Sequence, residues 1–404
     1  MKSFIAAAGM HDPASSLARS SLERIPSRAT SESSRVLHVI HPAEVGGAET
    51  VVRVLAAGQK AHGARVAVAA LVSREGASAA FVAGLRDQSI ETHYICVPGR
   101  AYLEERRAIA AICRLLSPTV VHTHGYRADV VDGLAVRHSV PIVSTVHGYT
   151  GGDTKNRLFE WLQRRSLRRC DAVVAVSTKL SHELQAAVQR DRLHVVPNAV
   201  APASNSLDRL AARTALGLPA NARIVGWVGR MSREKGADLL LDAFAESELP
   251  DDVQLALLGD GPELKALRSQ AKRLEIESRV RWLGRTKDAS RYFAAFDVLV
   301  LSSRTEGTPM VVLEAMSAGV PIIATRVGGV PDVLIQGTAF LVEPDAPVAL
   351  AASLREVLNN SQAARAVARA ARDRVEHRYG VMNWVEAYEA IYGAARACAA
   401  RRKR

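Results

Sequence analysis

Two glutamates eight positions apart stand in the most distinctive chemical setting of this 404-residue chain. Glu306 and Glu314 flank the run GTPMVVL, in which Gly307 permits close backbone approach and Pro309 suits the first position of a helix. The free N–H groups of a helix start bind anions such as phosphate. Glu314 would lie on the second turn, where a carboxylate can accept from the two vicinal hydroxyls of a ribose. Taken alone, the pattern equally fits an acid near a helix start followed by a surface charge.

Two cations occupy a loop between a predicted strand and a predicted helix. Segment 226–236 reads GWVGRMSREKG, so Arg230 and Lys235 follow the strand and precede the helix. A guanidinium binds phosphate oxygens through a fork of N–H groups and an ammonium acts as a point charge, so the pair suits a diphosphate. The segment matches neither the Walker A pattern nor G-x-G-x-x-G. Two solvated charges beside a turn are the plain alternative.

Glycines and histidines follow predicted strands in the first half of the chain. Gly46 and Gly47 precede a helix and would let a ligand approach the backbone, although an ordinary turn can have the same sequence. His147 ends one strand, and His122 and His124 end the preceding one, which suggests the polar wall of a cleft. A lone histidine is more often structural than catalytic. Without an accompanying carboxylate motif, the three histidines do not predict a metal site.

From Arg35 onward, short apolar runs alternate with longer amphipathic stretches, and the residues above lie at the ends of the apolar runs. The alternation predicts βα units and parallel sheets covered by helices on both faces. We expect strands at 36–40, 65–72, 92–97, 120–123, 142–146, 172–176 and 193–196, and then at 224–228, 253–258, 279–283, 298–301, 321–324 and 339–342. The Pro-, Ser- and Asn-rich segment 201–208 separates the two series. The predicted fold class is α/β, with two tandem doubly wound Rossmann-like domains whose strand ends face one interdomain cleft.

Length and composition bound the rest of the organisation. At about 150 residues per domain, the chain predicts two to three domains, preceded by a flexible Ser- and Arg-rich leader over 1–34. We expect one domain over 35–200, a second over 201–380, and a solvated basic tail over 400–404. The four cysteines form no C-x-x-C pair, and no stretch is long and apolar enough to span a membrane. These features favour a reducing, cytoplasmic compartment.

The charge balance is basic, with 53 Lys and Arg against 41 Asp and Glu and a net charge of +12. Such an excess suits nucleic acid, an anionic membrane face or phosphorylated substrates. One predicted helix carries basic side chains interleaved with apolar ones, so it could lie on anionic lipid, or it could simply be a packed helix with a solvated cationic face. Its cations are Lys155, Arg157, Arg164, Arg165, Arg168 and Arg169. With 5% aromatic residues and no reading-helix motif, nucleic acid is the least favoured partner.

Together these segments resemble the retaining glycosyltransferases of family 4, which have the GT-B architecture. The resemblance extends from Arg35 to about Tyr392. The matching pieces, in chain order, are GGAE at 46–49, VHTHG at 121–125, TVHG at 145–148, VAVS at 174–177, VPN at 196–198, VGR at 228–230 with KG at 235–236, LGDGP at 258–262, Glu306 with Glu314, and AGVP at 318–321 followed by GGVP at 328–331. Any one of them is weak, but their order and spacing are highly specific.

The resemblance implies a role for each domain and site residue. Segment 201–380 would bind a nucleotide-sugar donor, a UDP- or GDP-sugar, and segment 35–200 the acceptor, with helix 381–399 crossing back to the first domain. Arg230 and Lys235 would hold the diphosphate and Glu314 the ribose. The implied catalytic set is His147, Glu306, Arg230 and Lys235, and the implied donor-binding set is Gly47, Arg230, Lys235, Gly307, Thr308, Pro309, Met310 and Glu314. In that arrangement His147 would touch the donor sugar, Gly47 would bring its amide to the phosphates, and no cofactor or metal ion would be needed.

The function implied is a retaining, metal-independent hexosyltransferase of cell-surface or exopolysaccharide biosynthesis. Its acceptor would be a glycan or a lipid-linked glycan, and its location the cytoplasm or the inner face of the membrane. Another GT-B enzyme, such as a nucleotide-sugar 2-epimerase or a phosphorylase, is one alternative, and a non-catalytic nucleotide-sugar-binding protein is another. Two departures from the family pattern are PNAVA at 197–201, where PNGVD is common, and Asp332, where Glu is frequent.

Overall fold

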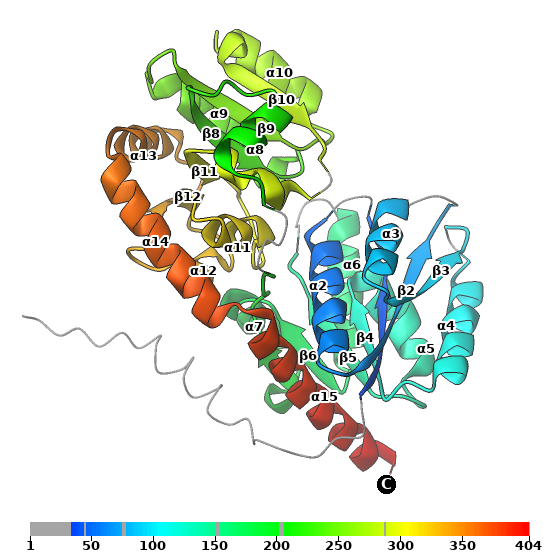
Figure 1. Ribbon diagram of the computed structural model, residues 1–404. Helices are drawn as coiled ribbons and strands as arrows, with labels where there is room; N and C mark the ends of the chain where they lie inside the picture. The colour runs from blue at the N-terminus through cyan, green and yellow to red at the C-terminus, as the bar shows by residue number, and fades with distance from the viewer. Residues whose placement is uncertain are drawn as a thin grey trace, which may run out of the picture. The chain divides into compact units, whose positions relative to one another are not determined.

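The computed structural model describes residues 34–43, 46–74, 78–99, 101–149, 154–201, 206–286 and 288–403; of 154–156 and 403 it describes the backbone alone. Apart from Ser34, the predicted leader lies outside these residues, as does half of the predicted linker at 201–208. The described chain contains two separate parallel β-sheets with helices between the strands (Figure 1).

The first sheet has seven parallel strands in the order β3-β2-β1-β4-β5-β6-β7. The strands are β1 Arg35–Ile40, β2 Arg65–Val72, β3 Glu91–Cys96, β4 Val120–His124, β5 Ile142–Val146, β6 Ala172–Ala175 and β7 Leu193–Val195. Because the strand order reverses beside β1, the carboxyl ends of β1 and β4 frame the switch point at which ligands bind in such sheets.

The second sheet has six parallel strands in the order β10-β9-β8-β11-β12-β13. The strands are β8 Arg223–Val228, β9 Val253–Leu258, β10 Val280–Gly284, β11 Val298–Leu301, β12 Ile322–Thr325 and β13 Phe340–Val342. Here the reversal lies between β8 and β11, which are neighbours in the sheet. The loops that leave these two strands therefore lie side by side.

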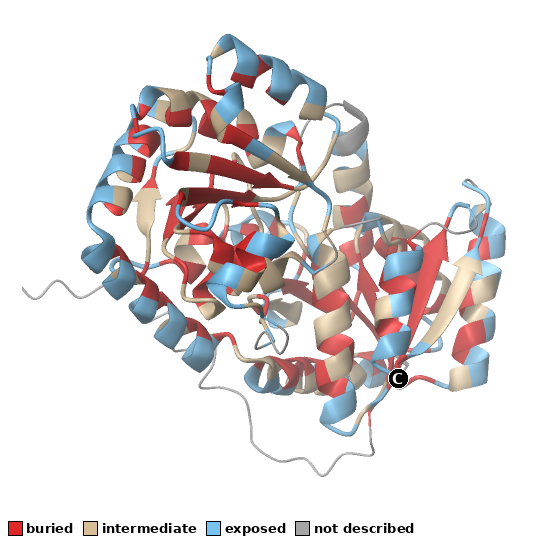
Figure 2. Cartoon of the chain, turned by 45° about the horizontal axis from the view of Figure 1, so that its top comes forward, coloured by how far each residue is buried: buried red, intermediate tan, exposed pale blue. Residues whose placement is uncertain are grey.

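Helices connect successive strands and cover both sheets. They are α2 Gly47–Ala61, α3 Ala79–Asp87, α4 Tyr102–Leu116, α5 Leu134–Val136, α6 Thr154–Leu167, α7 Thr178–Leu184, α8 Arg209–Ala215, α9 Ala237–Glu246, α10 Leu264–Arg273, α11 Met310–Ser317, α12 Val330–Val333, α13 Pro347–Asn359 and α14 Ser361–Arg378. A π-helical segment, Ala128–Gly133, follows β4, and short 3-10 segments lie at Arg190–Arg192, Arg233–Lys235, Glu277–Arg279 and Ala289–Ala295. Most strands are buried and the outer helix faces are exposed (Figure 2).

The strands lie within one or two residues of the positions predicted from the apolar runs. Strands β2, β5, β9 and β11 have the predicted bounds. Strand β3 differs in character, because its sequence ETHYIC is only half-buried. It is one of the two edge strands of the first sheet, so one side lacks the neighbour that would bury an apolar run.

The last helix, α15 Val381–Lys403, packs against the first sheet and against α2. A Cβ on Gly58 of α2 would lie 2.5 Å from a methyl group of Val381, so the absence of a side chain there permits this contact. Residues 400–403 continue the helix, where we predicted a solvated tail. Their alanine and arginine composition favours helix, and Arg402 Nη1 pairs with Asp171 Oδ1 at 3.0 Å.

Among the described residues, no helix combines the length and the apolar character that crossing a bilayer requires.

Candidate functional site

The loops that leave β8 and β11 bring two predicted site residues into direct contact. Lys235 Nζ lies 2.7 Å from Glu306 Oε1. Ser303 Oγ donates to the same carboxylate oxygen at 2.7 Å. The Glu306 side chain is 6% exposed and that of Lys235 32%, so the carboxylate is shielded while part of the lysine side chain faces solvent. One face of the lysine therefore stays available to an anion.

A glycine allows these two loops to touch. Gly236 has a φ of +65°, and a Cβ there would lie 2.0 Å from the carbonyl oxygen of Ser302. Any other residue would be strained by the backbone conformation and would also push the β11 loop away. The geometry of the Lys235–Glu306 pair therefore depends on this glycine.

Arg230, the other predicted phosphate-binding cation, is exposed. Among the described residues its side chain makes no hydrogen bond or ion pair, in contrast to Arg304, which is held by two bonds to Asp238. Arg230 and Lys235 lie in one loop, but only Lys235 contacts Glu306 in this structure. Among the described residues, Arg230 thus lacks the side-chain partner that Lys235 has in Glu306.

Helix α11 begins at Met310, directly after Pro309, which has an extended ψ of 114° and precedes the first turn. No described side chain caps the start of α11, so its first N–H groups are available to a ligand. Thr308 anchors the start: its carbonyl accepts from Asn198 Nδ2 at 3.0 Å, and its hydroxyl donates to the carbonyl of Val176. Both partners follow strands of the first sheet, so loops of the two sheets meet here.

His147 is adjacent to this helix start. A Cβ on Gly307 would lie 2.2 Å from the carbonyl oxygen of His147, which means that the two backbones touch. The structure therefore brings His147, Glu306, Gly307 and Lys235 together, as the site prediction requires. Glycine at 307 is explained by this close approach rather than by a special φ.

Glu314 lies on the second turn of α11, as expected. Burial raises the pKa of its carboxyl to about 8; the negative charge of Asp288 adds to the shift and Arg53 of α2 opposes it. The group is therefore largely protonated at neutral pH in the free protein. Helices α2 and α11 come from opposite sheets and are in contact, which places the start of α2 near the same region.

The start of α2 at Gly47 is open. A Cβ on Gly47 would meet no atom within 4 Å, so a ligand can reach the backbone amide. The carboxylate of Glu49 folds back toward the preceding residues and accepts from the backbone N–H of Ala43 at 2.6 Å. Burial raises the pKa of the Glu49 carboxyl.

The predicted histidine wall is a buried cluster instead. His122 lies within β4 and His124 at its end; both are buried, and a fourth histidine, His38 of β1, joins them. Only His147 borders the meeting point of the two sheets. Sequence reasoning missed His38 because it lies in the middle of an apolar strand, 84 positions before its nearest partner in β4.

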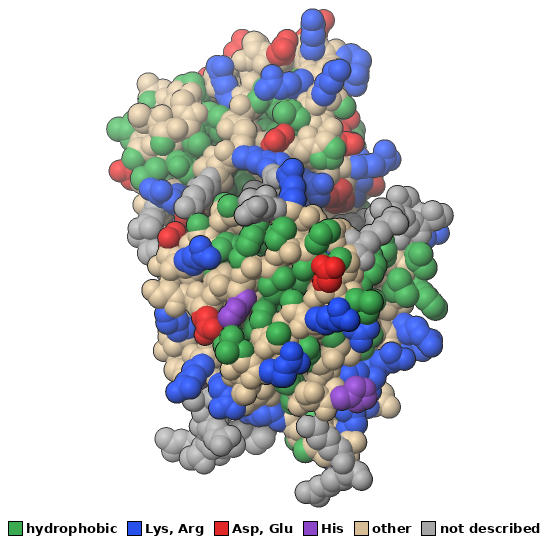
Figure 3. Space-filling model, turned by 90° about the vertical axis from the view of Figure 1, so that its right-hand side faces the viewer, with side chains coloured by type: hydrophobic (Ala, Val, Ile, Leu, Met, Phe, Trp, Pro, Cys, Tyr) green, Lys and Arg blue, Asp and Glu red, His purple; other side chains and the backbone are tan. Residues whose placement is uncertain are grey.

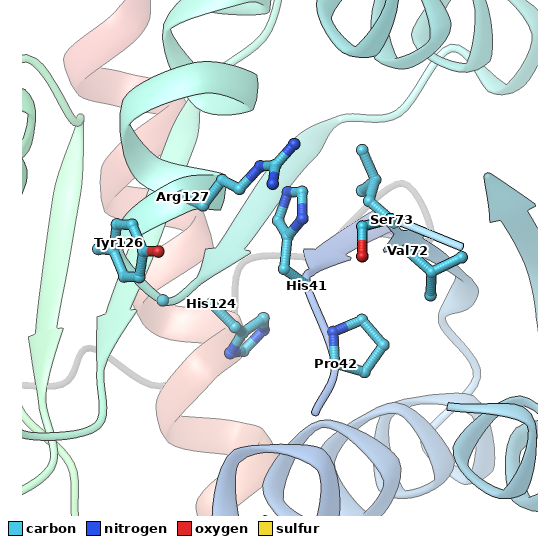
Figure 4. A pocket seen from close by; sticks show the side chains of 9 residues that line it. His41, Pro42, Val72, Ser73, His124, Tyr126 and Arg127 are labelled. Atoms are coloured by element: carbon cyan, nitrogen blue, oxygen red, sulfur yellow. The ribbon is translucent and has the colours of Figure 1, made fainter. Parts of the chain in front are cut away.

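His41 and Arg127 line a cavity of about 270 Å³ at the carboxyl ends of β1, β2 and β4, and each contacts a buried carboxylate (Figure 4). His41 Nε2 lies 2.9 Å from Asp132 Oδ2 and 3.0 Å from Glu105 Oε1. Arg127 forms an ion pair with the buried Glu105. Burial raises the pKa of Asp132 to about 6, whereas hydrogen bonds from His41 and Arg127 outweigh burial and lower that of Glu105 to about 2.

Two clusters have enough ligand atoms to be weighed as metal sites. In the first, formed by His38, His122 and His124, every ring nitrogen already has a hydrogen-bond partner. In the second, formed by His41, Glu105 and Asp132, Arg127 supplies the positive charge that the carboxylates need. Neither cluster requires an ion to satisfy its charges.

The predicted basic helix is α6, Thr154–Leu167, and it ends before Arg168 and Arg169, which lie in the following turn. Arg157 and Arg165 are exposed, and the side chain of Lys155 lies outside the description. Trp161 is 57% exposed and Leu158 54%. The exposed side of α6 is thus both apolar and basic.

Two family profiles match the sequence. The glycosyltransferase family 4 profile matches residues 45–204, and the profile described as glycosyl transferases group 1 matches residues 208–374. N-acetyl-alpha-D-glucosaminyl L-malate synthase of Bacillus anthracis is 30% identical over 261 residues, which are 63% of this chain and 68% of that protein. Alpha-maltose-1-phosphate synthase of Mycolicibacterium smegmatis is 31% identical over 272 residues, which are 60% of this chain and 69% of that protein.

Solved structures share the fold. HepE of Anabaena, in complex with UDP-glucose, matches with a TM-score of 0.76 at 24% identity, over 88% of this chain and 98% of that one. Sucrose-phosphate synthase of Thermosynechococcus elongatus matches with a TM-score of 0.76 at 21% identity, over 89% and 98%. The two parallel sheets thus form the two-domain α/β architecture called GT-B.

The sequence matches place the chain within this fold more closely. It belongs to glycosyltransferase family 4. The prediction of fold class and family from the sequence is confirmed.

Proposed function

We propose that this protein transfers a hexose from a nucleoside-diphosphate sugar to a hydroxyl group of an acceptor, with retention at the anomeric carbon and without a metal ion. The observation that carries the proposal is the Lys235–Glu306 pair at the uncapped start of α11, with Glu314 on the next turn. Cations and free amides suit the diphosphate, and a carboxylate on the second turn suits the ribose.

The chemistry follows from where charge develops. When the bond between the anomeric carbon and the diphosphate breaks, negative charge accumulates on the phosphate oxygens. Lys235, held by Glu306, and the amides at the start of α11 are in place before the reaction, and Arg230 would join them at the diphosphate. These groups would stabilise the transition state more than the ground state. Glu306 holds Lys235 in place and lies beside the position of the sugar. The family 4 motifs in the sequence support retention.

The acceptor would bind on the side of the first sheet. The polar residues at the switch point of that sheet favour an acceptor that carries hydroxyl groups. The cavity at His41 and Arg127 offers donors and acceptors at the switch point of that sheet. The relatives named above form products with malate and with a sugar phosphate, and another, of Escherichia coli, acts on a diphosphoundecaprenol-linked sugar and is 26% identical over 60% of this chain. We propose a glycan or lipid-linked glycan acceptor of cell-surface or exopolysaccharide biosynthesis.

We further propose that the enzyme works in the cytoplasm, on the inner face of the membrane, and that the exposed side of α6 contacts anionic lipid. Trp161 and Leu158 would enter the headgroup region while Arg157 and Arg165 pair with lipid phosphates. Lys and Arg side chains are also spread over the face of the molecule shown in Figure 3, which favours approach to an anionic surface.

A product assay tests the activity. Incubation with UDP- and GDP-hexoses and candidate polyprenyl-linked acceptors should give a glycoside with the anomeric configuration of the donor, in a chelator-containing buffer as well as with Mg²⁺. Epimerised donor formed without acceptor would indicate a 2-epimerase, and phosphate-dependent release of sugar phosphate would indicate a phosphorylase. Binding without turnover would indicate a non-catalytic protein. Each of these three outcomes contradicts the proposal.

A further inference from the structure

An unbroken row of hydrogen bonds runs through the interior of the first sheet and ends at His147. Gln59 Oε1 of α2 lies 2.8 Å from His38 Nε2. His38 Nδ1 lies 3.0 Å from His124 Nε2, and His124 Nδ1 lies 3.2 Å from His147 Nε2. Each of the two middle imidazoles therefore uses both ring nitrogens inside the row.

The other end of the Gln59 amide gives the row a direction. Gln59 Nε2 donates to the hydroxyl of Tyr392 in α15 at 2.8 Å, so the amide oxygen faces His38 and can only accept. His38 Nε2 must then carry the proton, which leaves His38 Nδ1 as an acceptor. A neutral imidazole has one N–H, so the same argument assigns the proton to Nε2 of His124 and then to Nε2 of His147.

Burial keeps all members of the row neutral. It lowers the pKa of His38 and of His147 to about 4, and that of His124 well below its usual value. At neutral pH each imidazole in the row therefore has one N–H that donates and one bare nitrogen that accepts. The tautomers are therefore coupled to one another rather than chosen independently.

The row ends on a nitrogen without a partner. His147 Nδ1 is buried and accepts no hydrogen bond from any residue that the structure describes. A buried acceptor left unpaired is unfavourable, so a ligand that donates to it gains affinity. The backbone of His147 touches Gly307, next to Glu306, so this residue lies beside the proposed donor site.

We propose that Gln59, acting through His38 and His124, fixes the tautomer of His147 so that its Nδ1 presents a lone pair to a hydroxyl group of the donor sugar. The inference rests on the proposed function, because it identifies the ligand as the sugar of the donor. Gln59, His38 and His124 are positioning residues, and His147 is the group that contacts the sugar. The ligand group must carry a hydrogen-bond donor; a group that only accepts does not fit.

The same amide supports a second branch that leads away from His147 and supplies a control. Tyr392 OH lies 2.8 Å from His122 Nδ1, His122 Nε2 lies 2.7 Å from Thr145 Oγ1, and Thr145 contacts the hydroxyl of Tyr388 at 3.1 Å. The variant Tyr388→Phe removes one buried hydroxyl of this network and leaves the row from Gln59 to His147 intact.

Nitrogen-15 NMR of histidine-labelled protein without ligand tests the tautomer directly, with His147 assigned from the spectrum of His147→Asn. We expect a protonated Nε2 and a bare Nδ1 in the wild type. In Gln59→Leu, an apolar group replaces the acceptor facing His38, so nothing holds the proton of His38 on Nε2. The fraction of His147 that carries its proton on Nδ1 should therefore rise. A proton on His147 Nδ1 in the wild type would overturn the inference, whether or not the variant folds.

Binding then separates a positioning role from a structural one. We expect Gln59→Leu to weaken binding of the nucleotide-sugar by about 5- to 10-fold while leaving the nucleoside diphosphate unaffected, because only the sugar touches His147. Tyr388→Phe should lower thermal stability without changing that ratio. An unchanged ratio in a folded Gln59→Leu protein would contradict the proposal. If the wild type bound no nucleotide-sugar, the proposed function would fail, while the spectra would still decide the tautomer.

Discussion

Glu314 is largely protonated in the free protein, and this protonation constrains how a nucleotide can bind. With a pKa of about 8, the carboxyl is mostly neutral at pH 7. Two ribose hydroxyls that donate to it favour the ionised form, so the pKa should fall in the complex. Binding should therefore release up to about one proton per nucleotide at pH 7, and the dissociation constant should fall as the pH rises toward 8.

Calorimetry in buffers of different ionisation enthalpy measures this proton release. Glu314→Gln, which cannot ionise, should bind more weakly and release no proton at this position. Binding to the wild type with no buffer dependence and no pH dependence between 6 and 8 would show that Glu314 does not take up the ribose as a carboxylate.

The buried histidines predict how stability responds to acid. Burial lowers the pKa of His122 and His124 well below the unfolded value of about 6.5. Below that value these histidines bind protons in the unfolded chain but not in the folded protein. The free energy of unfolding should therefore fall as the pH drops from about 6.5 toward 4. Each such histidine contributes up to about 1.4 kcal/mol per pH unit in this window.

Urea unfolding of the wild type and of His122→Asn at pH 7 and pH 5 isolates this contribution from that of the carboxyl groups, which both proteins share. The variant should be less stable at pH 7 but should lose less stability on acidification. Equal losses in both proteins would mean that His122 is not held neutral.

Local patterns located Glu306 before one helix start, Glu314 on the second turn of that helix and Lys235 in the loop after another strand, because each lies in a loop or turn whose position follows from the strands. The contact between Lys235 and Glu306 appears only in the folded structure. The same reasoning could not find the Gln59–His38 contact or the group at His41. Their partners are tens of positions apart and meet only through the strand order of the folded sheet. No spacing in the sequence records such contacts.

Among the elements, the start of α11 can lie directly against the first sheet because Gly307 has no side chain. In Gly307→Ala the new Cβ would lie 2.2 Å from the carbonyl oxygen of His147, so one of the two backbones must move. We expect a loss of about 1–3 kcal/mol in the free energy of unfolding and weaker binding of the nucleotide-sugar.

Gly393→Ala is the matched control for that substitution. Gly393 lies inside α15, and its new Cβ would approach only the end of the Arg396 side chain, at 3.9 Å. Alanine there should stabilise the helix by about 0.5–1 kcal/mol and leave binding unchanged. If both variants behaved alike in urea unfolding and in nucleotide titration, the contact between Gly307 and His147 would not be important in solution.

Helix α6 predicts a charge-dependent interaction with membranes. The double substitution of Arg157 and Arg165 to Glu should abolish sedimentation with liposomes that contain anionic lipid, because both cations lie beside the exposed Trp161. Substitution of Arg365 and Arg369 on α14 to Glu changes the net charge equally and should have little effect. Equal losses would assign the effect to net charge, and no sedimentation of the wild type would refute the contact.

The bounds of the elements show where sequence patterns are sufficient. Buried central strands such as β2 and β9 appear as continuous apolar runs and were located at their observed positions. The ends of α6 and α15 were not predicted correctly. Helix ends depend on contacts such as that of Arg402 with Asp171, which cannot be inferred from the local composition.

For the molecule as a whole, the two sheets explain why the site residues lie so far apart in the sequence. The Asn198–Thr308 hydrogen bond joins the loop after β7 to the start of α11, and Thr178 N–H donates to Asp332 Oδ2 at 2.7 Å. Both contacts lie at the carboxyl ends of strands, where the loops of each sheet converge. A sugar donor bound to the second sheet would thus meet residues of the first.

A thermal-shift titration of the whole protein with UDP, GDP, ADP and their hexose conjugates tests the central claim most directly. The account predicts that one nucleoside diphosphate and its sugar stabilise the wild type in a concentration-dependent way. It also predicts that Lys235→Ala and Glu314→Ala remove that shift while remaining folded. Absence of a shift with every nucleotide, or a shift that both variants retain in full, would contradict it.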